Sequence, residues 1–253
     1  DLWKSGLLKI LDTLEQIFNS PVNPEQELSV GMFKVRIPAF PVDMVREALL
    51  NAVTHRDYTE PGEVLVRHTK QELVITSPGG FPPGITPENI LKHEPIARNR
   101  SLAYAFLKLG LVESSGVGRR RIFIPALSFG KRIPQYETDG YRVTLRMFDG
   151  AFDEQMARLV AKRNRQEDSA VDLDALLLLT YLKANSYLDV AATTKLLQVP
   201  VNEAKAILEK WARPGMGILE RKGKTKAASF HLAKSIASEL LGKAAYTKMK
   251  GLN

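Results

Sequence analysis

Ten consecutive residues in the first half of the chain, SPGGFPPGIT at 77–86, contain three glycines and three prolines. Proline lacks the N–H that helices and central strands need, and glycine weakens both, so the stretch predicts a shaped loop. Just before it, EVLVRH and ELVITS alternate in polarity and are separated by TKQ, which is typical of a β-hairpin. We therefore expect a strand that runs directly into a rigid loop.

Helical periodicity surrounds this hairpin. Pro41 and Asp43 mark one helix start, because proline suits the first turn and an acid suits the positive helix end. TPEN, at 86–89, favours another start with Thr86 as the cap. The expected helices lie at about 4–19, 42–54 and 99–109, with a further helix after GVGRRR and flanking strands at 32–38 and 141–148.

The C-terminal part follows a different order. A charged stretch at 151–171 shows no deep apolar face and is predicted to be a linker. Beyond it come helix, short helix, turn, helix, two strands joined by a basic turn, and a last helix, the order of a winged helix-turn-helix. The predicted fold is a two-layer α/β sandwich over 1–150, with 1–30 as its lead-in, followed by an all-α-rich winged helix-turn-helix domain over 172–253.

Positive charge gathers at the C-terminal end. The chain carries a net charge of +8, and residues 201–253 contain 11 Lys and Arg against 4 Asp and Glu. Such a localised field indicates a polyanion-binding surface, although a solubilising face is an open alternative. There is no cysteine, the four histidines are scattered, and no apolar run reaches the roughly 20 residues of a membrane span. We expect a cytoplasmic protein without a metal held by protein ligands alone.

Three segments combine into a candidate nucleotide site. REALLNAVTH places Glu47 and Asn51 four residues apart, on one helix face. The loop 77–86 follows a strand, and a second glycine-bearing segment, GLVESSGVGRRRI, leads into a helix, where backbone N–H groups favour phosphate. Each segment alone has an ordinary structural explanation: an exposed helix face, a rigid turn and a helix-entry turn.

This order resembles the GHKL nucleotide-binding fold of gyrase, histidine kinases and the mismatch-repair protein MutL. A closer resemblance is to the RecG-related family of helicases and transcriptional regulators, over about residues 31–148. It is carried by the motifs HRDY, SPGGFPPGIT, RNR and LGLVESSGVGRRRI. The resemblance implies ATP and Mg²⁺ as cofactors, with Glu47 orienting the attacking water and Asn51 ligating Mg²⁺ through its amide oxygen. The implied nucleotide-binding residues are Asn51, Ser77, Gly79, Gly80, Gly84, Gly116, Gly118 and Arg119.

Ser77 departs from the family pattern, because an aspartate there normally accepts the adenine amino hydrogen. HRDY itself is better explained as a helix-end network, in which Arg and Asp pair and Tyr58 caps the helix. No Walker A motif, GxxxxGK followed by Ser or Thr, occurs in the chain, so helicase activity finds no support.

The second part carries the predicted contacts to double-stranded DNA. A recognition helix reads bases from its N-terminal side, and a basic wing suits phosphates or the minor groove. The candidates are Asn202, Lys205, Lys210, Arg213, Arg221, Lys222, Lys224 and Lys226. A winged helix used for protein contact is the alternative.

Three functions remain open from the sequence. The first is a bacterial-type DNA-binding transcriptional regulator with a divergent ATP-binding-like domain. The second is a slow Mg²⁺-dependent ATPase that acts with DNA and uses Glu47 as its base. The third is a degenerate docking or dimerisation module, and in the case of dimerisation the protein would be a homo-oligomer.

Overall fold

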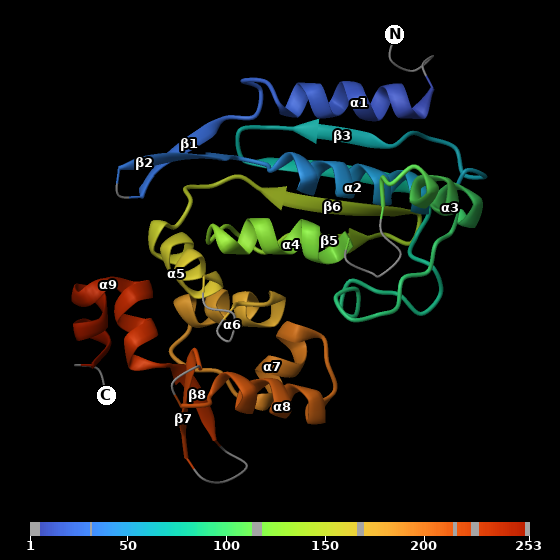
Figure 1. Ribbon diagram of the computed structural model, residues 1–253. Helices are drawn as coiled ribbons and strands as arrows, with labels where there is room; N and C mark the ends of the chain where they lie inside the picture. Colours follow the sequence, from blue (N-terminus) through green and yellow to red (C-terminus); the bar gives the residue numbers. More distant parts are fainter. Residues whose placement is uncertain are drawn as a thin grey trace. The chain divides into compact units, whose positions relative to one another are not determined.

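The structure, a computed structural model of the chain, describes residues 6–30, 32–112, 118–165, 170–214, 217–223 and 228–250. The chain divides into two compact units (Figure 1). The first unit consists of Asp1–Pro87, His93–Ala126 and Lys131–Ala151, and the second of Glu88–Lys92, Leu127–Gly130 and Phe152–Asn253. Helices and antiparallel sheets are both present, so the predicted α/β class is confirmed at this level.

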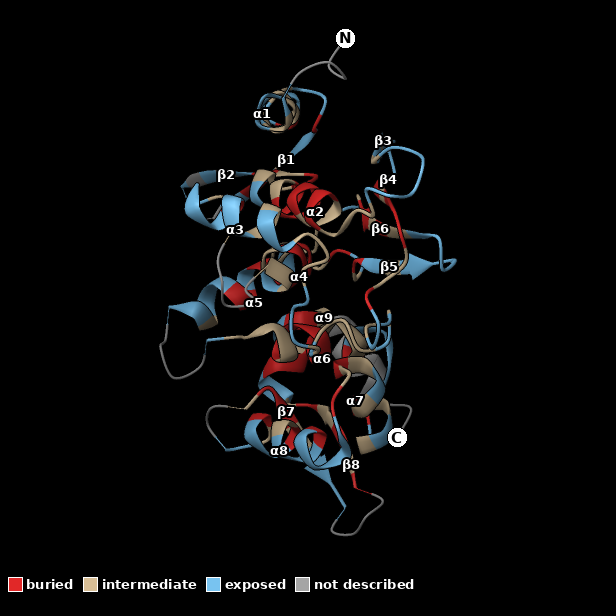
Figure 2. Cartoon of the chain, turned by 90° about the vertical axis from the view of Figure 1, so that its right-hand side faces the viewer, coloured by how far each residue is buried: buried red, intermediate tan, exposed pale blue. Residues whose placement is uncertain are grey.

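The first unit is built on a four-stranded antiparallel sheet in the order β3-β4-β6-β5. Helices α2 and α4 lie along one face of this sheet (Figures 1 and 2). The elements are α1 (Leu7–Phe18), β1 (Glu25–Val30), β2 (Phe33–Pro38), α2 (Val42–His55), β3 (Leu65–His68), β4 (Glu72–Pro78), α3 (Arg100–Lys108), α4 (Gly118–Ser128), β5 (Gln135–Thr138) and β6 (Arg142–Phe148).

The predicted hairpin is confirmed as β3 and β4, with Leu73 paired to His68. The predicted helix start at TPEN is wrong, because the structure has only turns there. The N–H of Leu91, which a helix would direct at the carbonyl of Pro87, donates instead to the Gln198 side chain at 2.7 Å. Strands β1 and β5 were not predicted, since their polar residues mask the alternation.

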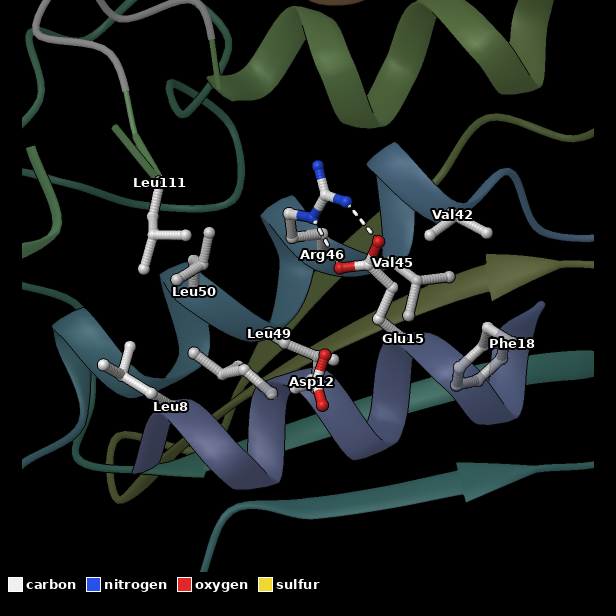
Figure 3. A pocket seen from close by; sticks show the side chains of 11 residues that line it. Leu8, Asp12, Glu15, Phe18, Val42, Val45, Arg46, Leu49, Leu50 and Leu111 are labelled. Atoms are coloured by element: carbon white, nitrogen blue, oxygen red, sulfur yellow. Dashed lines mark hydrogen bonds and ion pairs between the residues drawn. The ribbon is translucent and has the colours of Figure 1, made fainter. Parts of the chain in front are cut away.

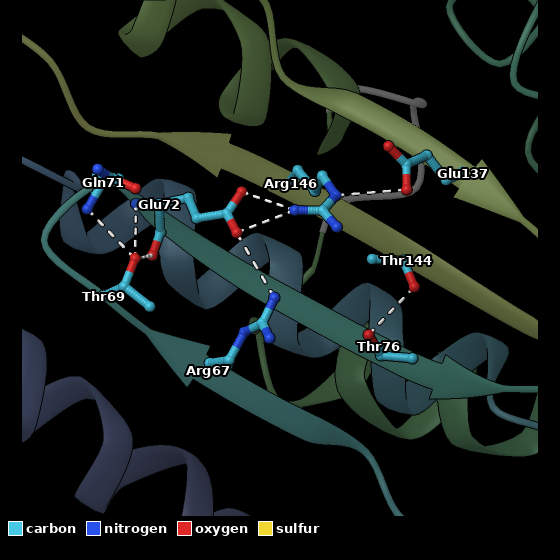
Figure 4. Close-up of polar contacts among 8 residues, drawn as sticks. All are labelled: Arg67, Thr69, Gln71, Glu72, Thr76, Glu137, Thr144 and Arg146. Atoms are coloured by element: carbon cyan, nitrogen blue, oxygen red, sulfur yellow. Dashed lines mark hydrogen bonds and ion pairs between the residues drawn. The ribbon is translucent and has the colours of Figure 1, made fainter.

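The sheet alternates in polarity between its two faces. Side chains that point toward the helices are buried: Leu73, Ile75, Leu145 and Met147. On the opposite face, Arg146 pairs with Glu72 at 2.8 Å and with Glu137 at 3.3 Å, while Thr76 and Thr144 are linked by a hydrogen bond (Figure 4). The two-residue period of strands therefore places Ser77, which follows Ile75 by two, on the helix side.

A cavity of about 220 Å³ lies between α1 and α2, and its lining is largely apolar (Figure 3). Two residues of the lining, Arg46 and Glu15, form an ion pair at 2.5 Å. The lining does not include Glu47 or Asn51. The cavity is also smaller than the roughly 300–1,000 Å³ typical of small-molecule sites, so we assign it no role.

Residues 151–171 contain a helix, α5 (Glu154–Asn164), that belongs to the second unit. Its N-terminus is capped by Asp153, which accepts from the N–H of Met156 at 3.0 Å. Met156, Ala157, Leu159 and Val160 are all buried. The expectation that this stretch has no deep apolar face is therefore wrong, because four apolar side chains at helical spacing form a narrow buried stripe between charged neighbours.

The rest of the second unit comprises α6 (Leu173–Ala184), α7 (Val190–Leu197), α8 (Val201–Trp211), β7 (Leu219–Lys222), β8 (Ser229–Leu232) and α9 (Lys234–Lys250). Five consecutive residues of α6, Ala175–Leu179, are buried on all sides (Figure 2). Strands β7 and β8 pair antiparallel, and Leu188 adds an isolated bridge to Phe230. Of the helices described, none combines the length and apolar character of a membrane span.

Candidate functional site

Glu47 and Asn51 are joined on α2. The amide nitrogen of Asn51 donates to Oε1 of Glu47 at 3.1 Å, and Glu47 is only 5% exposed. This bond uses the Asn51 nitrogen and does not involve its acceptor oxygen Oδ1. The predicted pairing of an acid and an amide on one helix face thus exists as a direct contact.

The start of α4 lies against Glu47. A Cβ atom at Gly118 would collide with Oε1 of Glu47, so a larger residue there would require this carboxylate to move. Nη1 of Arg121 lies 3.9 Å from Oε2 of the same carboxylate. The structure therefore brings together the acid-amide helix and the end of the second glycine segment, while Gly116 lies outside the described residues.

Tyr136 on β5 interacts electrostatically with Glu47. Burial raises the pKa of the Tyr136 phenol, and the negative charge of Glu47 raises it further. Burial also lowers the pKa of Arg119. The Phe81 and Phe123 rings lie 6.1 and 6.5 Å from the Tyr136 ring. Sequence reasoning missed Tyr136, because QYET carries no motif and only strand pairing places it here.

The first glycine loop packs against the chain itself. Ser77 is buried, and its hydroxyl donates to the carbonyl of Ala52 at 2.7 Å. At Gly79, φ is +93° and a Cβ would lie 2.6 Å from the Cβ of Asp57. A Cβ at Gly80 would lie 2.5 Å from the carbonyl oxygen of Gly140. Two of the predicted base-lining glycines are thus required by close protein packing.

Arg98 holds this loop to the end of α2. Its guanidinium pairs with Asp57 at 2.8 Å and donates to the carbonyl oxygens of Gly80 at 2.6 Å and His55 at 3.1 Å. One part of the predicted helix-end network is confirmed, because the Tyr58 hydroxyl donates to the carbonyl of Val53. The predicted Arg–Asp pair is different in the structure. Asp57 pairs with Arg98 of RNR, 41 residues away, which the HRDY motif alone could not identify, and Arg56 donates to the carbonyl of Gly62.

The last predicted residue of this loop, Gly84, has φ +88°, and a Cβ there would come within 3.5 Å of the His93 ring.

Taken together, the two ends of the candidate site differ. Asn51 Oδ1, the start of α4 and its arginines suit Mg²⁺ and phosphates. At the other end, Ser77 offers no carboxylate to an adenine base, and its hydroxyl donates a hydrogen bond to the carbonyl of Ala52.

The predicted DNA-contacting residues lie on α8 and around the β7–β8 hairpin. Ala204, Leu208 and Trp211 turn inward, whereas Asn202, Lys205, Arg213 and Lys222 are exposed. Two predicted cations are engaged in ion pairs: Lys210 with Asp172 and Arg221 with Glu209, both at 2.8 Å. Lys224 and Lys226 lie outside the described residues.

Comparisons with known proteins find one solved structure similar over most of the chain and one family model that matches part of the first unit. A solved structure, the DIP2311 protein from Corynebacterium diphtheriae, is 28% identical and superposes with a TM-score of 0.80 over 94% of this chain. The chain spans 48% of the length of that protein. No curated protein matches the chain. Residues 62–147 match the family described as "Putative ATP-dependent DNA helicase recG C-terminal", which confirms the RecG-related resemblance over these residues.

Proposed function

We propose that this protein is a DNA-binding transcriptional regulator, with a winged helix-turn-helix in its second unit and a divergent GHKL-like ATP-binding domain in its first. The main support for the proposal is the exposed N-terminal part of α8. It follows α7 across a tight turn in which Gln198 is left-handed, and it exposes Asn202 and Lys205. An isolated bridge pairs Leu188, just before α7, with Phe230 of the β7–β8 hairpin, and we interpret this hairpin as the wing.

The exposed residues divide into two roles. Asn202 and Lys205, in the first turns of α8, are suited to base edges, and Arg213 and Lys222 are suited to phosphates. Lys210 and Arg221 are given less weight, since Asp172 and Glu209 already offset their charges. The proposed target is double-stranded DNA. The affinity of the protein for this DNA should fall steeply as the salt concentration rises.

Changing Lys205 and Lys222 together to Glu tests this proposal. We expect about a 100-fold loss of affinity for a labelled mixed-sequence duplex in low salt, because two positive charges facing the DNA become negative and repel it. Fluorescence anisotropy across a salt series measures it. The control, Lys9→Glu with Lys70→Glu, makes the same change of net charge on exposed residues of the first unit. An equal loss in the control, or wild-type binding that ignores salt, would contradict the proposal.

A slow Mg²⁺-dependent ATPase is the second candidate function. It is favoured by the contact of Glu47 with Asn51 and with the start of α4, where a water, a cation and phosphates could be held together. In this role Glu47 would orient or deprotonate the attacking water. The residue set fits the phosphate end of a nucleotide better than its base.

Calorimetric titration of Mg-ATP examines this candidate. We expect Asn51→Ala to weaken binding at least about 10-fold, because it removes the amide oxygen that would ligate the cation. Asn185→Ala, an exposed change on the second unit, should bind like the wild type. Absence of heat at millimolar nucleotide would leave the first unit as a docking or dimerisation module.

A further inference from the structure

Residues 88–92 belong to the second unit although the chain enters them from Pro87 and leaves them to His93, both in the first unit. We call them the inserted segment. The N–H of Leu91 in this segment donates to Oε1 of Gln198 at 2.7 Å. Gln198, with φ +57°, is the left-handed residue that joins α7 to α8. The inserted segment therefore holds the turn that sets the direction of α8.

Lys92 adds a second anchor. Its ammonium lies 3.1 and 3.2 Å from the two carboxylate oxygens of Asp174, in the first turn of α6, and 3.8 Å from Glu203, in the first turn of α8. The Asp174 side chain is only 18% exposed, so this ion pair is partly shielded from water. One ammonium thus links the N-terminal ends of two helices.

The position of Glu203 gives these contacts a functional consequence. Glu203 lies in the first turn of α8, next to Asn202 in the sequence, so its negative charge is within one helical turn of the residues suited to DNA. An unpaired carboxylate there would repel phosphates and draw the first turn of α8 away from its place. Lys92 offsets this charge from the side of α6, while the Leu91 bond keeps the turn in place.

Resting on the proposed function, we propose that Lys92 is a positioning residue for DNA binding, and that the inserted segment is a required part of the DNA-binding unit. Lys92 acts through Glu203 and Asp174, not by touching DNA. The DNA-binding unit is therefore not confined to the stretch that begins at residue 172.

The test uses the full chain and the same labelled duplex. Lys92→Met should weaken binding about 10-fold with a near-native slope of log affinity against log salt, and Lys92→Arg should restore it. Gln198→Asn, which keeps a residue tolerant of the left-handed conformation but is too short to reach Leu91, should also weaken binding. Lys70→Met, an equal charge change on the first unit, should have no effect. Circular dichroism establishes that each variant is folded.

Native affinity in both Lys92→Met and Gln198→Asn would overturn the inference. A salt slope reduced by about one in Lys92→Met would also overturn it, because the residue would then contact a phosphate directly. Failure of the wild-type chain to bind DNA would instead refute the proposed function. The two failures are therefore distinguishable in one experiment.

Discussion

Gly79→Ala is expected to lower the free energy of unfolding by about 2–5 kcal/mol, the combined effect of a strained backbone and an overpacked contact. Gly79 has φ +93°, which side-chain-bearing residues rarely adopt. Its N–H donates to the carbonyl of Tyr141 at 2.7 Å, so the loop cannot rotate without losing this bond. A methyl group would also meet Asp57 at 2.6 Å. Urea denaturation of the full chain gives the difference.

Gly150→Ala is the matched control. No atom lies within 4 Å of a Cβ built at Gly150, and its φ is not positive, so stability should stay within about 0.5 kcal/mol of the wild type. A Gly79→Ala variant of native stability that had lost only nucleotide binding would contradict our interpretation. It would mean that contact with a bound nucleotide base, and not packing against Asp57, requires glycine at position 79.

Met156→Ala is expected to destabilise the second unit by about 2–5 kcal/mol, the usual range for emptying a buried methionine site. Met156 is 0% exposed, in the helix that occupies the stretch predicted as a linker. Removing its thioether side chain would leave a cavity on the buried side of α5, next to Ala157, Leu159 and Val160. Thermal denaturation followed by circular dichroism measures the shift.

Gln155→Ala changes the neighbouring residue of the same helix, whose side chain is exposed. This control should alter stability by less than about 0.5 kcal/mol, since alanine is a good helix former and nothing buried is lost. Equal, small effects for Met156→Ala and Gln155→Ala would show that α5 contributes no core and that 151–171 behaves as a linker.

Local patterns were enough for most elements. The spacing of apolar residues identified α1, α2, α6 and α8, and alternation with a short turn identified β3 and β4. These signals depend on the helical and strand periods alone. They failed where partners lie far away. Strand β5 is polar by itself and becomes a strand by pairing with β6, and the N–H of Leu91, just after TPEN, donates to Gln198 instead of to a helical carbonyl.

The candidate site divides in the same way. The contact between Glu47 and Asn51 could be predicted because residues four apart share a helix face. Tyr136 and Arg98 could not, because strand pairing and an ion pair across 41 residues bring them in. Ser77 was identified as a departure, but the side it faces depends on the register of β4 against β6.

By itself the sequence determined most of the element types, the acid-amide helix face, the two glycine segments and the concentration of positive charge near the C-terminal end. These are properties of neighbouring residues, and short-range sterics and periodicity decide them. Only the tertiary structure decided which residues Gly79 and Arg98 meet, that α5 is buried, and that residues 88–92 support α8. Such contacts join distant stretches, and their energies depend on packing that no local pattern encodes.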